Sequence, residues 1–353
     1  MSYDQTQPIE LPEEAVRFNG SGGEYFRIWI VNLLLTILTF GIYGAWAKVR
    51  RLQYFYRNTE LAGASFDYHG NPVAILKGRI IALGLFLAYS SSRNISLGAF
   101  MMTALFIALI MPWLLRNALR FRLHNSSYRG LRLRFDGSQA GAYKTFLGYG
   151  LLALFTFYLA APLFHQRLKQ YQHGNAHFGR TAFSFSANVG QFYRAYLLIA
   201  LLLIGAFVLA GAQFGIAFSH LQHLNQKPNP IALASAMFLG ALIIFVSMLM
   251  IGPMWQARIQ NLVWNNTTLG SHKFRSDVSA WKLFTIYVTN FVGVVFTFGL
   301  FTPWAMVRLA RYRAQTITLI PATSLDEFVA DQEQEVSAAG EETTEFFDID
   351  IGL

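Results

Sequence analysis

The chain alternates long apolar stretches with short polar ones, and this alternation sets the expected fold. Seven stretches are apolar over a length that, at about 1.5 Å per residue, reaches across a hydrocarbon layer of about 30 Å. Trp and Tyr gather at their ends, as they do at membrane–water interfaces. We therefore predict an all-α polytopic membrane protein. The seven apolar helical segments cover residues 28–47, 73–90, 95–115, 145–164, 194–218, 231–254 and 283–304.

Three regions differ in composition along the chain. Residues 1–24 form a polar N-terminal segment with no basic start and no early apolar run, so we expect no cleavable signal peptide. Residues 25–320 form the expected transmembrane domain. Residues 321–353 are acidic and lack helical periodicity, which predicts a disordered acidic C-terminal tail.

A composite motif recurs through the transmembrane region and indicates five imperfect repeats. Each copy has a helix breaker and a basic stretch, and in the first four copies a short polar hairpin with Asn, Gly and Phe follows. Alternation of apolar and polar residues in 131–135 and 183–185 predicts brief strands there. The first and last copies match best, at an offset of 258 residues. The aligned pairs include Asn32 with Asn290, Trp46 with Trp304, and Arg50 with Arg308.

The Trp-x-x-x-Arg stretch, the hairpin with Asn, Gly and Phe, and their repetition resemble the YjgN-like family of bacterial inner-membrane proteins. The resemblance covers about residues 17–320. It implies a multi-pass inner-membrane protein without an established molecular activity, and it supplies no catalytic residues. The third copy departs from the pattern, because it has Leu163 where the first and fifth copies have Trp.

Charge is distributed unevenly and points to a membrane surface as partner. The chain is 54% hydrophobic and 13% charged, whereas soluble domains carry about 25% charged residues. All 28 Lys and Arg precede residue 314 together with nine acids, and the other ten acids follow Ile320. The body therefore carries +19 and the tail −10. A basic, hydrophobic body favours anionic lipid over nucleic acid, and the acidic tail is available for a protein partner.

Two topologies fit the basic residues. If all seven segments span the membrane, Lys and Arg divide 17 to 11 between the two sides, and the N-terminus lies outside. Alternatively, the single apolar segments of copies one, three and five dip in and return, bending near Gly41, Ala160–Ala161 and Gly299. The division is then 26 to 2. Both topologies place the C-terminus in the cytoplasm, and the second also places every basic loop there.

Polar residues within or beside the apolar segments are the candidate site residues. No Asp or Glu lies inside any apolar segment, which disfavours transport coupled to a buried carboxylate. Asn32 and Asn290 are the intramembrane polar pair, and such residues either line a site or hydrogen-bond between helices. Interfacial Trp and Arg residues either bind lipid headgroups or only anchor the helices. These candidates are Trp46, Arg50, Arg51, Arg116, Arg120, Arg167, Arg258, Trp304, Arg308 and Arg311.

Two functions from different classes remain. The first is a transporter or channel-like protein without intramembrane carboxylate coupling, favoured by the repeats and the paired asparagines. The alternative is a non-transporting membrane scaffold that binds anionic lipid or protein partners. An enzyme is not expected, since the sequence offers no catalytic, cofactor-binding or metal-ligating set.

Overall fold

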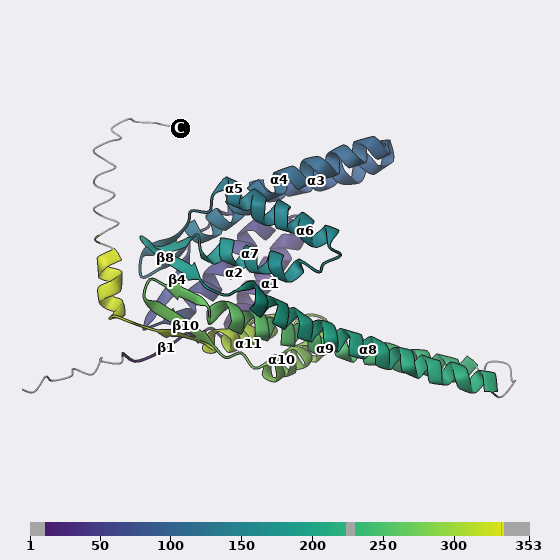
Figure 1. Ribbon diagram of the computed structural model, residues 1–353. Helices are drawn as coiled ribbons and strands as arrows, with labels where there is room; N and C mark the ends of the chain where they lie inside the picture. Colours follow the sequence, from purple (N-terminus) through teal and green to yellow (C-terminus); the bar gives the residue numbers. More distant parts are fainter. Residues whose placement is uncertain (1–10, 224–229, 333, 335–353) are drawn as a thin grey trace, which may run out of the picture.

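A computed structural model describes residues 11–223, 230–332 and 334 of the chain. Helices dominate, and they extend to one side of a continuous antiparallel sheet (Figure 1). The helical character of the prediction is confirmed, but the all-α class is wrong in one respect. The polar hairpins between the helices join into one eleven-stranded sheet.

The sheet closes on itself, and we call it the β-ring. Its strand order is β1-β11-β10-β9-β8-β7-β6-β5-β4-β3-β2, and the two end strands β1 and β2 are separated along the chain only by Val16. Each strand therefore has a partner on either side or a direct chain connection. The bounds are β1 Glu14–Ala15, β2 Arg17–Phe18, β3 Thr59–Leu61, β4 Ala64–Tyr68, β5 Ser126–Tyr128, β6 Leu131–Phe135, β7 Ala176–Phe178, β8 Thr181–Phe185, β9 Thr267–Leu269, β10 His272–Ser276 and β11 Ile317–Ile320.

The brief strands predicted from alternation are confirmed, as β6 and the end of β8. Each hairpin pairs within itself and then with the hairpin of the next copy; for example, β4 pairs with β5 through Phe66 and Tyr128. The alternation of apolar and polar residues predicts the individual strands. The pairing of one hairpin with the next joins residues far apart in the sequence, so no local pattern predicts it.

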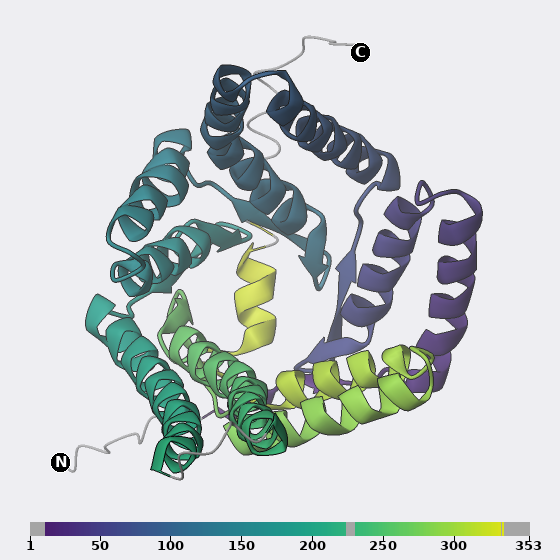
Figure 2. The ribbon, with the colours of Figure 1, turned by 90° about the vertical axis from the view of Figure 1, so that its right-hand side faces the viewer.

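The helices pack in antiparallel pairs that stand around a common centre (Figure 2). The last pair lies beside the first, because α1 packs against α11. The bounds are α1 Gly22–Leu38, α2 Gly44–Arg57, α3 Pro72–Ile95, α4 Leu97–His124, α5 Gln139–Ala142, the π-helical η1 Tyr143–Gly148, α6 Tyr149–Phe155, α7 Ala161–His173, α8 Val189–His223, α9 Pro230–Trp264, α10 Ala280–Phe296 and α11 Thr302–Gln315.

Four helices are long and apolar enough to cross a membrane, whereas one of the two topologies predicted from the sequence has all seven apolar segments spanning it. Their apolar side chains are almost entirely unburied within the chain, as expected for helices that face lipid. The prediction of seven continuous spans is therefore not confirmed. The four candidate spans are Pro72–Ile95, Leu97–His124, Val189–Gln213 and Leu233–Trp264.

Each of the other three apolar segments is interrupted in the middle by a left-handed turn. In the first, α1 ends in a left-handed turn with φ of 49° at Phe40 and 91° at Gly41. The Gly41 amide donates to Thr36 O, and the Phe40 amide to Ile37 O, which is the Schellman arrangement. The Thr39 hydroxyl donates back to Leu35 O and accepts from the Tyr43 amide. The chain thus reverses between α1 and α2, near Gly41, as the re-entrant alternative predicts.

The other two breaks repeat this pattern. Phe298 and Gly299 have φ of 49° and 91°, and Thr297 makes the same two hydrogen bonds as Thr39. In the third copy the left-handed residues are Phe157 and Tyr158, so the break lies about three residues before the predicted Ala160–Ala161. The phenylalanine at each tip is fully exposed: 99% for Phe40, 90% for Phe157 and 97% for Phe298.

A C-terminal helix, residues 325–332, docks on the β-ring and corrects the prediction of a tail without structure from residue 321. Phe328 and Val329 pack into a core formed by strand residues such as Tyr128 and Phe178. The Gln332 side-chain oxygen accepts hydrogen bonds from the backbone amides of Arg180 and Thr181, and Asp326 pairs with Arg129. In the end-on view of Figure 2 this helix, in yellow, lies in line with the centre of the ring, and Figure 1 shows it beyond the strands, on the side away from the long helices. Residues 333 and 335–353 of the predicted tail lie outside the described residues.

Because Gly41 adopts a left-handed conformation, we predict that any side chain at this position lowers the stability of the protein. In Gly41→Ala, an L-residue at φ 91° should lower the free energy of unfolding by about 1 kcal/mol or more. Gly84→Ala is the matched control, since an added Cβ meets nothing within 4 Å in the middle of α3 and should stabilise the helix by about 0.5–1 kcal/mol. Unfolding in detergent measures both. Equal effects of the two substitutions would contradict the break.

Docking of the C-terminal helix predicts protection of one of its faces. The chain has no cysteine, so the reaction rate of a single introduced cysteine measures the accessibility of that position alone. Val329→Cys, at a buried position, should react with a polar maleimide on the order of tenfold more slowly than Glu327→Cys, at an exposed one. The difference should vanish after denaturation. Equal rates in the folded protein would show that the helix is not docked.

Candidate anion-binding pocket

Two short helices and the start of a long one create a pocket beside the β-ring. α1 begins with a capping box, in which the Ser21 hydroxyl accepts from the Glu24 amide and the Glu24 carboxylate from the Ser21 amide. α2 buries Ala45 and Val49 against Tyr68 of the β-ring. Lys48 and Arg51 are three residues apart on another face of α2, so their side chains lie together.

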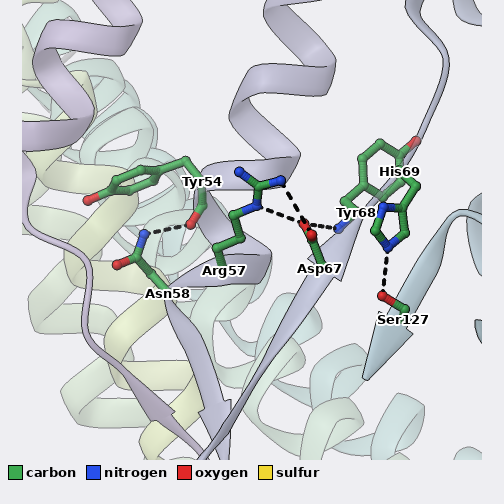
Figure 3. Close-up of polar contacts among 7 residues, drawn as sticks. All are labelled: Tyr54, Arg57, Asn58, Asp67, Tyr68, His69 and Ser127. Carbon is green, nitrogen blue, oxygen red and sulfur yellow. Dashed lines mark hydrogen bonds and ion pairs between the residues drawn. The ribbon is translucent and has the colours of Figure 1, made fainter. Parts of the chain in front are cut away.

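An ion pair between Arg57 at the C-terminal end of α2 and Asp67 on β4 joins this helix to the β-ring (Figure 3). Asp67 on β4 accepts from Arg57 at 2.8 Å and from the Tyr68 amide at 2.7 Å. The Asn58 side chain caps the helix by donating to Tyr54 O at 2.8 Å. Asp67 is therefore committed to the end of α2, away from Lys48.

The helix α3 brings a further cation to the pocket. The Asn71 side chain caps its first turn, and Pro72 occupies the first helical position. Arg79 follows two turns later and lies against Gly44 of α2. A Cβ added at Gly44 would come within 2.6 Å of Arg79 Nη1. The absence of a side chain at Gly44 thus makes room for the guanidinium.

These elements enclose a hollow of about 340 Å³ with a cationic and an apolar part. Met306 of α11 completes the wall, and the Tyr25 hydroxyl contacts its sulfur at 3.9 Å. The lining residues are Tyr25, Trp29, Asn32, Leu33, Thr36, Gly44, Ala47, Lys48, Arg51, Arg79 and Met306.

No carboxylate balances the cations of the pocket. In the described part of the chain, the arginines that form ion pairs are Arg57, Arg129, Arg134 and Arg275. Burial and then the positive charges of Arg79, Arg51 and Arg122 lower the pKa of Lys48. The lining includes no Asp or Glu. An anion in the pocket would relieve this repulsion and return the lysine toward its ordinary pKa.

The two predicted asparagines are both buried, but they have different surroundings. Asn290 donates to Ala305 O at 3.1 Å, and its oxygen accepts from Arg308 at 2.9 Å. It joins α10 to α11 and is a packing residue. Asn32 lines the pocket, and its Oδ1 has no hydrogen-bond partner within the described residues. Neither residue's hydrogen bonds or pocket neighbours include the other.

The remaining predicted residues mostly contact protein. Arg116 donates to Gly137 O at 2.6 Å and Arg311 to Gly20 O at 2.7 Å. Arg50 lies over the Tyr43 ring, which stacks on Trp46. Arg167 lies over the Tyr149 ring and Trp304 packs on Phe26, whereas Arg120 and Arg258 are exposed.

Of the predicted candidates, the structure places Asn32 and Arg51 in the pocket. Lys48 and Arg79 also line the pocket but are not among the site residues predicted from the sequence. A signal was present for Arg79, since it lies inside the predicted apolar segment 73–90, and an ionisable residue at such a position marks a functional site by default. For Lys48 the only signal was weaker: it lies three residues before Arg51, a spacing that places both side chains on one face of a helix.

The contrast between the asparagines predicts unequal costs of removing them. Asn290→Ala leaves the Arg308 guanidinium without its acceptor and should lower the free energy of unfolding by about 1–3 kcal/mol. Asn32→Ala removes an oxygen that has no partner, so its cost should be clearly smaller. Unfolding of both variants in the same detergent provides the comparison. A larger loss for Asn32→Ala would contradict this assignment.

Comparisons with known proteins agree with the membrane architecture. The family described as "Bacterial protein of unknown function (DUF898)" matches residues 13–346. "Inner membrane protein YjgN" of Salmonella typhimurium is 26% identical over 355 residues, covering 84% of this chain and 86% of the relative. The protein of the same name from Escherichia coli K12 is 31% identical over 140 residues, covering 38% and 34%.

No solved structure matches the chain. The resemblance to YjgN-like proteins is confirmed by these relatives, which are named inner membrane proteins. With a match over most of its length, the chain belongs to the DUF898 family of bacterial proteins.

Proposed function

We propose that this chain is a non-transporting scaffold of the bacterial inner membrane that binds anionic lipid at its cytoplasmic interface. The observation that carries the proposal is the set of unpaired cations at the base of apolar, lipid-facing helices. The pocket cations are one part of this set, and a second hollow of about 500 Å³ contains Arg27 and Arg50 on another face of α1 and α2. Anionic headgroups are the partners that a membrane offers to such a surface.

The topology that we propose has the β-ring and both described ends of the chain in the cytoplasm. The pairs α3–α4 and α8–α9 cross the bilayer, and the three broken segments re-enter with Phe40, Phe157 and Phe298 at their tips. This arrangement combines five imperfect helix-pair repeats with cytoplasmic hairpins. It follows the rule that basic loops lie inside. The hydrogen-bonded turns at the tips satisfy the backbone where the chain reverses.

The packing of the β-ring supports the scaffold over the transporter. Side chains from the strands, including Leu61, Leu131 and Leu269, form a single apolar core with Phe328 and Val329 of the C-terminal helix. A polar solute that moved along the ring axis would have to displace this core. The unpaired cations, in contrast, lie on the helices beside the ring, where lipid reaches them.

The proposal predicts a salt-sensitive enrichment of anionic lipid. The full chain purified from membranes in mild detergent should retain anionic phospholipid severalfold in excess over zwitterionic phospholipid, because each interfacial cation contributes about 1 kcal/mol. Raising the ionic strength should reduce the excess. Quantitative lipid analysis measures both effects. Lys273→Gln, an exposed position on β10, is the control and should leave the excess unchanged.

Retention of the two lipid classes in their membrane proportions would refute lipid binding. A separate measurement addresses transport. Vesicles that contain the protein should hold a trapped small anionic dye as long as empty vesicles do. Faster release from the protein-containing vesicles would instead favour the channel-like alternative.

A further inference from the structure

We infer that the pocket between α1, α2 and α3 binds the phosphate group of one anionic phospholipid. This inference rests on the proposed function and deepens it, since it assigns a single site and a ligand class to a general lipid-binding surface. It also goes beyond the prediction from the sequence, which named Arg51 but neither Lys48 nor Arg79 as a headgroup contact.

The cations of the pocket match the chemistry of a phosphate. Arg51 and Arg79 present planar guanidinium groups, which bind phosphate oxygens in bidentate fashion, and Lys48 adds a point charge. The three come from two helices that the β-ring and the Asn71 cap hold in place. The unpartnered Oδ1 of Asn32 lies in the same lining, and because an amide oxygen only accepts, its partner must be a donor such as a headgroup hydroxyl rather than a phosphate oxygen.

The surroundings of the pocket select a lipid over a free phosphate ion. Trp29 and Leu33 form part of the lining, and Leu33 remains 37% exposed on the outer face of α1. Ile80, next to Arg79 on α3, is 60% exposed. A phosphate bound to the cations therefore has apolar, lipid-facing side chains beside it, where acyl chains can lie.

The same surroundings disfavour a zwitterionic headgroup. The ammonium group of an ethanolamine headgroup needs a carboxylate partner when it leaves water, and the lining contains no Asp or Glu. It would instead meet three positive side chains. The pocket therefore selects phospholipids whose headgroup has a net negative charge.

The site is not repeated in the last helix pair. At the offset of 258 residues, Met306 replaces Lys48, Leu309 replaces Arg51 and Thr302 replaces Gly44. The asparagine of that copy, Asn290, is already satisfied by Arg308. Copies one and five therefore share the left-handed turn between their helices, but of these two only the first has the cations and the space for a phosphate.

The test measures binding of one phospholipid to the full chain in detergent by native mass spectrometry. Phosphatidylglycerol is the probe, and phosphatidylethanolamine with the same acyl chains is the zwitterionic comparison. The unaltered chain should bind one phosphatidylglycerol molecule most tightly. The triple variant Lys48→Gln, Arg51→Gln, Arg79→Gln should bind that molecule about a hundredfold more weakly, at about a factor of five for each cation.

A matched control removes the same charge elsewhere. Arg132→Gln, Arg180→Gln, Lys273→Gln alters three exposed positions of the β-ring outside the pocket and should leave the tight site intact. A second variant, Gly44→Ala, keeps every charge but displaces Arg79 through its Cβ. It should weaken the tight site by several-fold, and it decides the matter if the triple variant does not fold.

Three outcomes would overturn the inference. The first is equal loss of tight binding in the pocket and control variants. The second is equally tight binding of phosphatidylethanolamine. The third is displacement of the lipid by millimolar inorganic phosphate, which would assign the site to the free ion. If the unaltered chain retains excess anionic lipid while the pocket variants keep the tight site, only this inference fails. If the unaltered chain retains no excess, the proposed function fails with it.

Discussion

Closure of the β-ring is the constraint on which the rest of the structure depends. Its strands are two to five residues long, and isolated hairpins of this size are marginal in water. Each becomes stable only because the neighbouring hairpin supplies the second set of hydrogen bonds. The chain around Val16 joins the two ends of the sheet, so the exposed strand edges that invite aggregation are largely removed. Because every helix pair connects two adjacent strands of the ring, ring closure also determines which helices meet.

Local features of this fold were predictable from the sequence, and features that depend on distant partners were not. The reversals at Gly41 and Gly299 and the strand Leu131–Phe135 follow from glycine, threonine and alternation within a few residues. The ring, in contrast, depends on pairings such as Phe66 with Tyr128, about sixty residues apart. The length of an apolar segment did not distinguish a spanning helix from a broken one. In the third segment the turn at Phe157–Tyr158 contains no glycine that would have marked the break.

The C-terminal helix and the pocket show how a dominant signal can hide a weaker one. Leu325, Phe328, Val329 and Gln332 follow helical spacing, but the density of acids around them indicated a solvated tail. In the pocket, Arg79 was counted among the loop charges although its neighbours are apolar. The asparagine pair was recognised from its repeat offset, yet the roles of its members differ. Arg308 holds Asn290 in a helix contact, and the absence of such a partner leaves Asn32 with the cations.

The unequal lengths of the helix pairs have a consequence for the bilayer itself. At about 1.5 Å per residue, the 35 residues of α8 reach about 50 Å, whereas the 17 residues of α1 reach about 25 Å, and the continuous helical run of α5, η1 and α6 over residues 139–155 is no longer than α1. The perimeter of the protein therefore presents different hydrophobic thicknesses on different sides. Lipids next to the short pairs must tilt, compress or thin to match them, at a cost of a fraction of a kcal/mol per Å. The protein should accordingly concentrate where the membrane is already thin or curved, and it should thin the membrane where it resides.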